Sequence, residues 1–294
     1  MKMIYKQQNN MILKKKDCDI IIRVRNEIKE LTLLLNDLHN QKSVDFNVII
    51  LDTNSIDGTA EFLLNRKDVL LFSVDKADFH YGKSLDFLVS KCVSDYVFSF
   101  SSHIRIVDKE ILYKTIQFLK TDQSSNVCAG YFRQVPNFSY GCSEYERVFL
   151  NHGFPKLKSP QKIDGDFKKI KFSNAASVFR RAEVAAFNFG KYNGSEDKIW
   201  AYNMIARGKE IVYFGNMSIQ HSHNETLEQL KKRIFINYVA QMQFTHERII
   251  PLAIFFKYLF GLIYLFPFAI KTHALMYARI AYKASREAVG FVFR

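Results

Sequence analysis

The first 120 residues alternate short β-branched apolar runs with segments that carry apolar residues at helical spacing. Leu31, Leu34 and Leu38 mark the first of the helical segments. Strands that alternate with helices form βαβ units, with the strands mostly parallel in one sheet and helices on both faces. The sequence therefore predicts an α/β fold with a Rossmann-like sheet. The strand-like runs are 19–24, 46–51, 69–74 and 96–100.

After residue 120 the alternation is less regular, with short apolar runs at 126–133 and 170–179 and no internal repeat. Hydrophobic residues make up 48% of the 294, which is enough for a substantial core. We expect a polar lead-in over 1–16, an α/β domain over 17–225 and a helical region over 226–294.

The net charge of +13 is concentrated in the C-terminal region. Residues 231–294 hold ten Lys+Arg and two Asp+Glu, so this stretch alone supplies 10 − 2 = +8. The same stretch contains the longest apolar run of the chain. Basic charge next to apolar residues favours an anionic membrane surface as the partner. Because no recognition motif for nucleic acid is present, we do not expect nucleic-acid binding.

The apolar run at 249–270 has one charged residue, Lys257, and its 22 residues match the thickness of a bilayer. Pro251 and Pro267 interrupt it. An aromatic-rich helix with basic flanks that lies in the membrane interface fits this pattern. Packing on the α/β domain and a true membrane span stay open as alternatives.

Four cysteines, at 18, 92, 128 and 142, form no CxxC pair and suggest neither a zinc site nor a disulfide framework. The first 19 residues lack an uninterrupted apolar stretch, so we expect no secretion signal. Both features favour a reduced, cytoplasmic setting.

Polar residues follow two of the predicted strands, where ligands bind in open α/β sheets. Asp52 ends the second strand and leads into the turn-rich loop "TNSIDGT", which contains Asp57. A carboxylate there accepts hydrogen bonds from a base or a ribose, although a plain turn uses the same residue types. The run "YVFSFSSHIR" ends in Ser101, Ser102 and His103. The alternative for His103 is a hydrogen-bonded histidine at a strand end.

Two further segments carry residues of chemical interest. Glu196 and Asp197 follow Ser195 at a predicted helix start, where acids stabilise the helix dipole and Ser195 is a capping residue. Either acid is alternatively a general base. His221 and His223 are two residues apart, so on a strand they would share a face, as metal ligands do. Paired histidines also occur on exposed strands without a ligand.

Taken in this order, these segments resemble the family 2 glycosyltransferases of the GT-A fold over residues 19–225. The match divides the domain into a nucleotide-binding half, 17–120, and an acceptor half, 121–225. The matching segments are "IIIRVRNE" (20–27), "VIILDTNSIDGT" (48–59), "FHYGKSLD" (79–86), "SEDKIW" (195–200) and "GKEIVYFGNMSIQHSH" (208–223).

The resemblance implies an inverting transfer of a sugar from a UDP- or dTDP-type nucleotide sugar to a glycan or lipid-linked acceptor. Such an enzyme would serve bacterial cell-surface polysaccharide synthesis, peripherally on the cytoplasmic face of the cell membrane. Asp197, with Glu196, would take the acceptor's proton, and Asp52 would contact the base or ribose. Arg23 and Arg25 would share a strand face in the nucleotide pocket.

One departure from the family concerns the metal. The family carries Asp-x-Asp where this chain has Ser101-Ser102-His103, and His103 occupies the metal-binding position. The resemblance implies a divalent cofactor, Mn²⁺ or Mg²⁺, and imidazole ligands favour Mn²⁺. His223 is the expected second ligand and His221 the alternative. Basic side chains would otherwise neutralise the diphosphate. The donor-binding residues implied are Arg23, Arg25, Asp52, Asp57, Lys83, Ser101, Ser102 and Arg105.

The missing carboxylates also leave a rival hypothesis. A catalytically silent GT-A-like protein would keep the nucleotide-binding loop and bind a nucleotide or a partner without sugar transfer. Turnover of any nucleotide sugar distinguishes the two.

Overall fold

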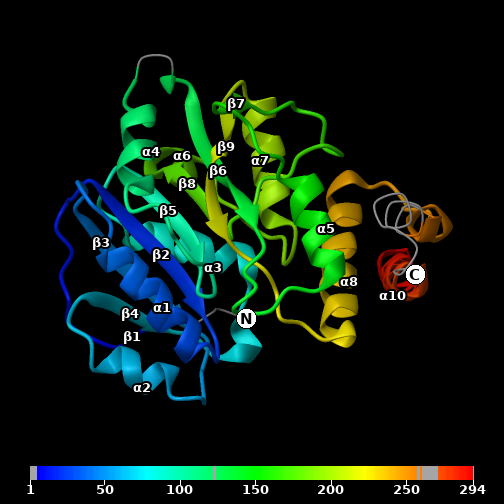
Figure 1. Ribbon diagram of the computed structural model, residues 1–294, viewed down its shortest axis with the longest axis horizontal. Coiled ribbons are helices and arrows are strands. Elements are labelled where there is room, and N and C mark those ends of the chain that lie inside the picture. The colour runs from blue at the N-terminus through cyan, green and yellow to red at the C-terminus, as the bar shows by residue number, and fades with distance from the viewer. Residues whose placement is uncertain (1–4, 122–123, 257–258, 260–270, 294) are drawn as a thin grey trace.

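The computed structural model describes residues 5–121, 124–256, 259 and 271–293 (Figure 1). Within these residues one nine-stranded sheet has the order β1-β4-β3-β2-β5-β8-β6-β9-β7. The strands are β1 (Lys6–Gln7), β2 (Cys18–Val24), β3 (Phe46–Asp52), β4 (Val69–Ser73), β5 (Tyr96–Ser101), β6 (Val127–Val135), β7 (Gln161–Lys162), β8 (Ala176–Arg180) and β9 (Glu210–Gln220).

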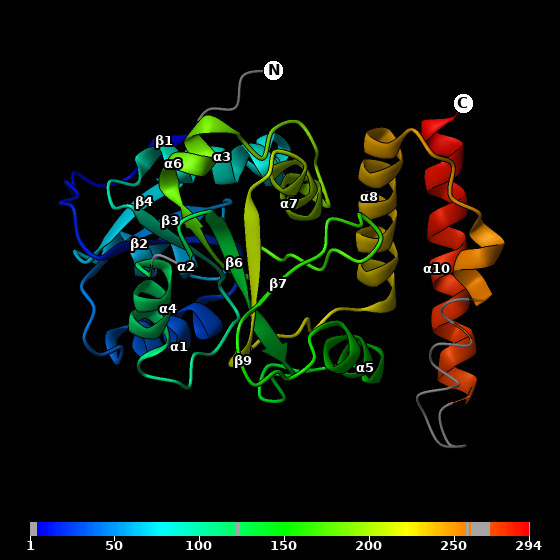
Figure 2. The ribbon, with the colours of Figure 1, turned by 90° about the horizontal axis from the view of Figure 1, so that it is seen from above.

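Helices connect most of the strands and cover both faces of the sheet, as Figure 2 shows. They are α1 (Ile28–His39), α2 (Thr59–Leu64), the 3₁₀ turn η1 (Lys76–Asp78), α3 (Tyr81–Lys91), α4 (Ile111–Leu119), α5 (Glu144–Gly153), α6 (Arg181–Ala186), α7 (Glu196–Ala206), α8 (Leu227–Thr245) and α10 (Lys271–Val292).

Apart from the two-residue edge strand β1, which pairs antiparallel with β4, the first half of the sheet is parallel, as the sequence predicts. Ile20 of β2 pairs with Val48 of β3 on one side and with Phe98 of β5 on the other, both in parallel register. β8 is antiparallel between β5 and β6, and β9 returns parallel to β6. The prediction of a mostly parallel α/β sheet is therefore confirmed.

Alternation along the strands builds two cores. Ile20 and Ile22 pack with α1 and α4 on one face, while Ile21 packs with α3 and α7 on the other. These side chains are almost fully buried, because a strand with helices on both faces has no exposed side. Of the short apolar run at 170–179, only the part from Ala176 is in a strand, β8.

The C-terminal region is helical, as expected. α8 lies beside α7 and the domain, and α10 packs along the outer side of α8 in the same direction (Figure 2). Leu230 and Ile234 of α8 meet Ala281 and Ala284 of α10, and small alanines allow the two helices to approach closely. α10 therefore reaches the domain through α8.

Of the apolar run 249–270, residues 257–258 and 260–270 lie outside the described residues. In the described part of the chain, no helix combines the length and the apolar character that crossing a membrane requires. Three of the four cysteines are buried and all four are free thiols.

Candidate functional site

A cavity of about 700 Å³ lies where β2 and β5 end, bordered by the start of α7 and by α8. Arg23 and Ser101 face it from the two strands, Asp197 from α7 and Asn237 from α8. The sheet thus brings together residues that are more than 200 positions apart. The carboxyl ends of parallel strands are where such sheets bind ligands.

Two adjacent acids, Glu196 and Asp197, line this cavity at the first turn of α7. The backbone N–H of Lys198 donates to Asp197 Oδ1 at 2.7 Å, and that of Asn174 donates to Oδ2 at 3.2 Å. Arg23 Nη1 lies 3.9 Å from Glu196 Oε1. The two backbone N–H groups therefore fix the Asp197 carboxylate, whereas Arg23 is only at the limit of an ion pair with Glu196.

Burial raises the pKa of both acids, and the neighbouring charge of Asp197 raises that of Glu196 further, to about 7. In a like-charged pair, the member with the higher pKa takes the first proton and the other stays ionised. The pair can thus present one carboxylate at neutral pH as a proton acceptor.

The turn before the acids is held by α8. Ser195 has a left-handed backbone (φ 47°), so the expectation that its side chain caps α7 is wrong: capping residues use the extended region. Instead, its N–H donates to Asn237 Oδ1 at 3.1 Å and its Oγ accepts from Gln241 Nε2 at 3.0 Å. Gly194 (φ 142°) lies against Ile236, where a Cβ would come within 2.5 Å of Cγ2.

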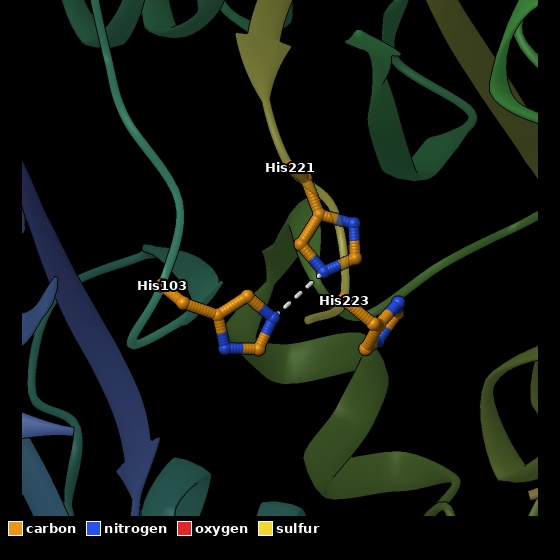
Figure 3. Close-up of side chains that lie close together, drawn as sticks. All are labelled: His103, His221 and His223. Carbon is orange, nitrogen blue, oxygen red and sulfur yellow. Dashed lines mark hydrogen bonds between the residues drawn. The ribbon is translucent and has the colours of Figure 1, made fainter. Parts of the chain in front are cut away.

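Three histidines meet on the other side of the cavity. His103, His221 and His223 each offer a ring nitrogen, and these atoms lie within 4.8 Å of one another (Figure 3). His103 Nε2 is 3.2 Å from His221 Nε2. The expectation that the His pair shares a strand face is wrong, because β9 ends at Gln220. The two histidines still converge with His103, from the segment that follows the strand.

A carboxylate stands behind His103. Glu27, at the start of α1, lies 3.0 Å from His103 Nδ1 and also accepts from the hydroxyls of Ser102 and Tyr140. Burial opposes ionisation of Glu27, but the hydrogen bonds from His103, Ser102 and Tyr140 outweigh it and hold its pKa below the ordinary value. Glu27 is therefore a carboxylate at neutral pH.

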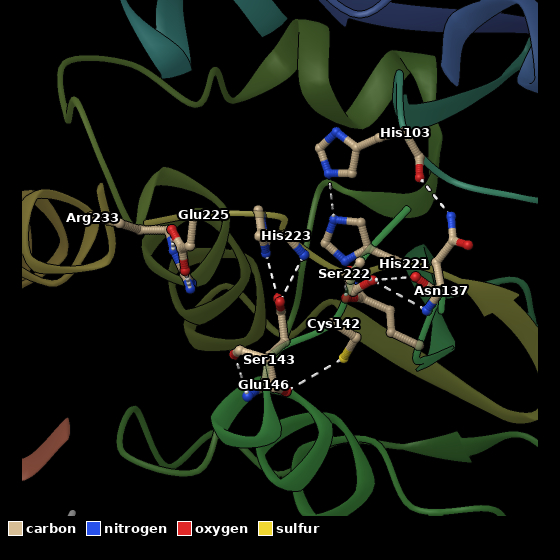
Figure 4. A network of polar contacts seen from close by, with 12 residues as sticks. His103, Asn137, Cys142, Ser143, Glu146, His221, Ser222, His223, Glu225 and Arg233 are labelled. Atoms are coloured by element: carbon tan, nitrogen blue, oxygen red, sulfur yellow. Dashed lines mark hydrogen bonds and ion pairs between the residues drawn. The ribbon is translucent and has the colours of Figure 1, made fainter. Parts of the chain in front are cut away.

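The other two histidines also have partners at Nδ1, and Figure 4 shows the contact of His223 with Glu146. His221 Nδ1 lies 2.8 Å from Gln134 Oε1, and His223 Nδ1 lies 2.5 Å from Glu146 Oε1. Burial lowers the pKa of both imidazoles well below the ordinary value, so both are neutral at pH 7. Neutral imidazole is the form that binds metals.

The residues behind the histidines were not singled out from the sequence. Glu27 ends the quoted segment "IIIRVRNE", so its position was visible although its role was not. Gln134 and Glu146 lie in the irregular second half, and no motif marks them. Only the fold shows what they contact.

Asp52 lies apart from this cavity, at the end of β3. It is 3% exposed and accepts from the backbone N–H and the hydroxyl of Ser55. Together with Asn54 and Ser73, it lines a second cavity of about 380 Å³. Asp57 holds the same loop, accepting from the backbone N–H groups of Ile28 and Thr59. Asp57 therefore has a visible structural role.

The predicted basic residues are placed differently from one another. Arg23 lines the main cavity and donates to the Tyr81 carbonyl at 3.0 Å. Arg25 lies beyond the end of β2, so it does not share a strand face with Arg23. Arg105 makes two hydrogen bonds to Asp37, at 2.6 and 2.9 Å, and it lines neither cavity. Lys83 also lines neither.

Comparisons with known proteins give consistent matches. The family model "Glycosyl transferase family 2" matches residues 19–172. O-antigen chain rhamnosyltransferase RfbN of Salmonella typhimurium is 23% identical over 208 residues, which cover 69% of this chain and 65% of that protein. O-antigen chain rhamnosyltransferase WbaN of Salmonella anatum is 26% identical over 64% of this chain and 60% of its own length. The alignments thus cover less than two thirds of either relative.

Solved structures share the fold. A mannosyltransferase of Pyrobaculum calidifontis, in complex with GDP-Man and Mn²⁺, has a TM-score of 0.55 at 13% identity, covering 95% of this chain and 74% of its own. TarS of S. aureus (residues 1–349) in complex with UDP has a TM-score of 0.54 at 14% identity, covering 93% and 90%. These similarities confirm the predicted GT-A fold.

Proposed function

This chain belongs to glycosyltransferase family 2, and from that premise we propose that it transfers a sugar from a nucleotide sugar to a glycan or lipid-linked acceptor. The product would be part of a cell-surface polysaccharide. The names of the two O-antigen relatives support this. One observation carries the proposal: a single cavity joins two adjacent acids, Glu196 and Asp197, to three anchored histidines, at the carboxyl ends of parallel strands.

The reaction proposed is an inverting displacement with Asp197 as the base. The acceptor hydroxyl gives its proton to the Asp197 carboxylate while its oxygen attacks the anomeric carbon. The bond from that carbon to the diphosphate breaks, and the nucleoside diphosphate leaves with the electron pair. Both oxygens of Asp197 accept backbone N–H groups, which fixes the carboxylate. Glu196 holds the first proton of the pair and so leaves Asp197 ionised.

The nucleotide part of the donor, of the UDP or dTDP type, is assigned to the β3 end of the sheet. Asp52 and the second cavity would take the base or ribose, while Arg23 and Ser101 face the main cavity. The Ser102 hydroxyl donates to Glu27, so its role is to support His103.

A divalent metal fits the histidines. His103, His221 and His223 would hold it through neutral ring nitrogens, which suit Mn²⁺ better than Mg²⁺. When bound, such an ion supplies countercharge to the departing diphosphate. The alternative source of countercharge is Arg105. Because Arg105 is already paired with Asp37, we favour the metal.

The activity is tested with purified protein and a panel of UDP-, dTDP- and GDP-sugars that includes a rhamnosyl donor. Release of nucleoside diphosphate is measured with and without glycan acceptors, and the product's anomeric configuration is read by NMR. Inversion is expected. Nucleotide binding without turnover of any donor would support the catalytically silent alternative, and retention would contradict Asp197 as the base.

The proposal also places the enzyme peripherally on the cytoplasmic face of the cell membrane, near a lipid-linked acceptor. Arg279, Lys283 and Arg286 are exposed on one face of α10, at intervals of four and three residues. Cations so spaced bind anionic lipid at about 1 kcal/mol each. Replacing the three by Glu should abolish sedimentation with anionic liposomes. The matched control replaces exposed Lys42, Lys67 and Lys109 by Glu, and an equal loss there would point to net charge alone.

A further inference from the structure

We infer that His103, His221 and His223 form an all-nitrogen centre that selects a metal of the zinc class over Mn²⁺ and Mg²⁺. We further infer that Glu27 and Glu146 are positioning residues that fix its ligands. This inference rests on the proposed function in that it names the metal of the same donor site. It goes further by assigning the kind of ion and the carboxylates behind it.

The first argument is the spacing of the nitrogens. Two imidazole nitrogens bound to one tetrahedral Zn²⁺ at about 2.05 Å lie about 3.3 Å apart. His103 Nε2 and His221 Nε2 are 3.2 Å apart, and the third imidazole offers a nitrogen within 4.8 Å of both. The rings therefore already have a separation that suits ligation by one small ion.

The second argument is where the ring protons lie. The Nδ1 atoms of His103 and His223 face the carboxylates of Glu27 and Glu146. A carboxylate can only accept, so each of these rings carries a proton on Nδ1, and the lone pair that can bind a metal is on Nε2. This carboxylate–histidine arrangement is the usual outer shell of a metal-bound histidine.

The Nε2 atoms of His103 and His221 lie where a cation could join the two rings. The Nδ1 of His221 lies 2.8 Å from Gln134 Oε1, and an amide oxygen accepts, so this contact places a ring proton on Nδ1. His103 Nε2 and His221 Nε2 are hydrogen-bonded to each other at 3.2 Å. A cation between them would replace this hydrogen bond and take a lone pair from each ring. Glu27, Gln134 and Glu146 come from three separate segments and hold the three rings in this arrangement.

The third argument is the chemistry of the ligands. The cluster contains no carboxylate among its three ligands. Mg²⁺ prefers oxygen, whereas imidazole suits zinc, and affinity at nitrogen sites rises from Mn²⁺ through Co²⁺ towards the end of the series. Neutral ligands also leave the full 2+ charge on the ion, whereas two carboxylates would cancel it. A dianionic diphosphate requires such a countercharge.

The experiment uses the full chain, freed of metal with a chelator and titrated with Co²⁺ in the absence of any nucleotide sugar. We expect one Co²⁺ per chain, with visible d–d absorption typical of four or five ligands. Zn²⁺ should displace Co²⁺ stoichiometrically, whereas millimolar Mg²⁺ should not displace it. Mn²⁺ should compete with Co²⁺ at least 10-fold more weakly than Zn²⁺ does. Equal competition by Mn²⁺ or Mg²⁺, or no Co²⁺ absorption, overturns the inference with no variant needed.

The outer shell is tested in the same assay. His103→Ala should lose Co²⁺ binding, and Glu27→Gln and Glu146→Gln should weaken it 10- to 100-fold. Glu110→Gln is the matched control, because Glu110 is half-exposed and paired only with Lys114 among the described contacts. Thermal unfolding verifies that each variant is folded. If the folded Glu27→Gln and Glu146→Gln variants bind Co²⁺ like wild type, then Glu27 and Glu146 do not position the histidine ligands.

The readout separates this inference from the proposed function. Metal binding is measured without donor or acceptor, so a failure to transfer sugar leaves it unaffected. Conversely, full transfer in chelator would refute the role of the metal in the reaction and leave the transferase activity established.

Discussion

Replacing Asp197 by Asn tests the assignment of the base most directly. The substitution keeps the shape of the side chain and removes its ability to accept a proton. Loss of a general base lowers turnover by about 10²- to 10⁴-fold, or roughly 3–5 kcal/mol of activation free energy. Donor binding should be unchanged, because Asp197 is expected to contact the acceptor.

The structure also predicts a cost to stability. Asp197 accepts one backbone N–H on each oxygen, from Lys198 and from Asn174. An amide has a single acceptor oxygen, so in the Asn variant one buried N–H faces an NH₂ group. Such a lost hydrogen bond costs about 1–3 kcal/mol. Removal of the charge next to Glu196 offsets part of it, so the variant should remain folded.

The assay measures turnover at saturating donor, together with nucleotide affinity by calorimetry and unfolding by heat. Asp166→Asn is the control, since Asp166 also accepts a backbone N–H, from Lys168 at 2.9 Å, on an exposed loop. A folded Asp197→Asn variant with turnover within threefold of wild type would mean that Asp197 only stabilises the start of α7. An equal loss of nucleotide affinity would place it in the donor site.

Three further predictions concern single positions. Glu196 has a folded pKa of about 7 against 4.5 unfolded, so the folded state holds its proton more tightly and stability is lost as pH rises through that window. As pH rises from 4 to 8, the free energy of unfolding of Glu196→Gln should therefore rise by up to roughly 3 kcal/mol relative to that of wild type. The difference in urea midpoints measures it, and an identical pH dependence of the two proteins would contradict the burial argument. Gly194→Ala should lower the free energy of unfolding by about 2–4 kcal/mol, because alanine is strained at this positive φ and its Cβ would clash with Ile236. A melting temperature unchanged from wild type would show that Ile236 and α8 shift at little cost. Asp52→Ala should weaken UDP or dTDP binding at least 10-fold while the melting temperature falls only a few degrees, and a collapse of the fold with normal binding in the surviving fraction would make Asp52 structural.

The fold followed from the sequence because its signals are local. Apolar runs of five or six residues and leucines at helical spacing predict β2, β3, β5 and α1, and these elements form as expected. The polar residues at the ends of β3 and β5 were located by the same reasoning, since parallel strands end at one edge. After residue 120 the alternation of strands and helices is less regular. Periodicity does not predict the order of strands in a sheet, so it does not show that β8 lies antiparallel between β5 and β6.

The details of the candidate site depended on contacts that no spacing reveals. Glu27 and His103 are 76 positions apart, and Glu146 and His223 are 77 apart. Arg105 was a reasonable partner for a diphosphate by charge alone, yet α1 supplies Asp37 closer at hand. The residue type of Ser195 predicts a helix cap, whereas the left-handed turn directs its hydroxyl to α8.

One side of helix α8 packs against the turn that contains Gly194 and Ser195, and its other side packs against α10. The C-terminal region is consequently not a detachable anchor. A fragment that ends before residue 227 would lose a wall of the cavity and the partners of Ser195. A fragment that ends after Thr245 would keep both, but it would uncover the apolar seam of Leu230, Ile234 and Met242 and would tend to aggregate. For crystallisation, a shortened chain needs polar substitutions along that seam, while the side of α8 that faces the turn has to stay as it is.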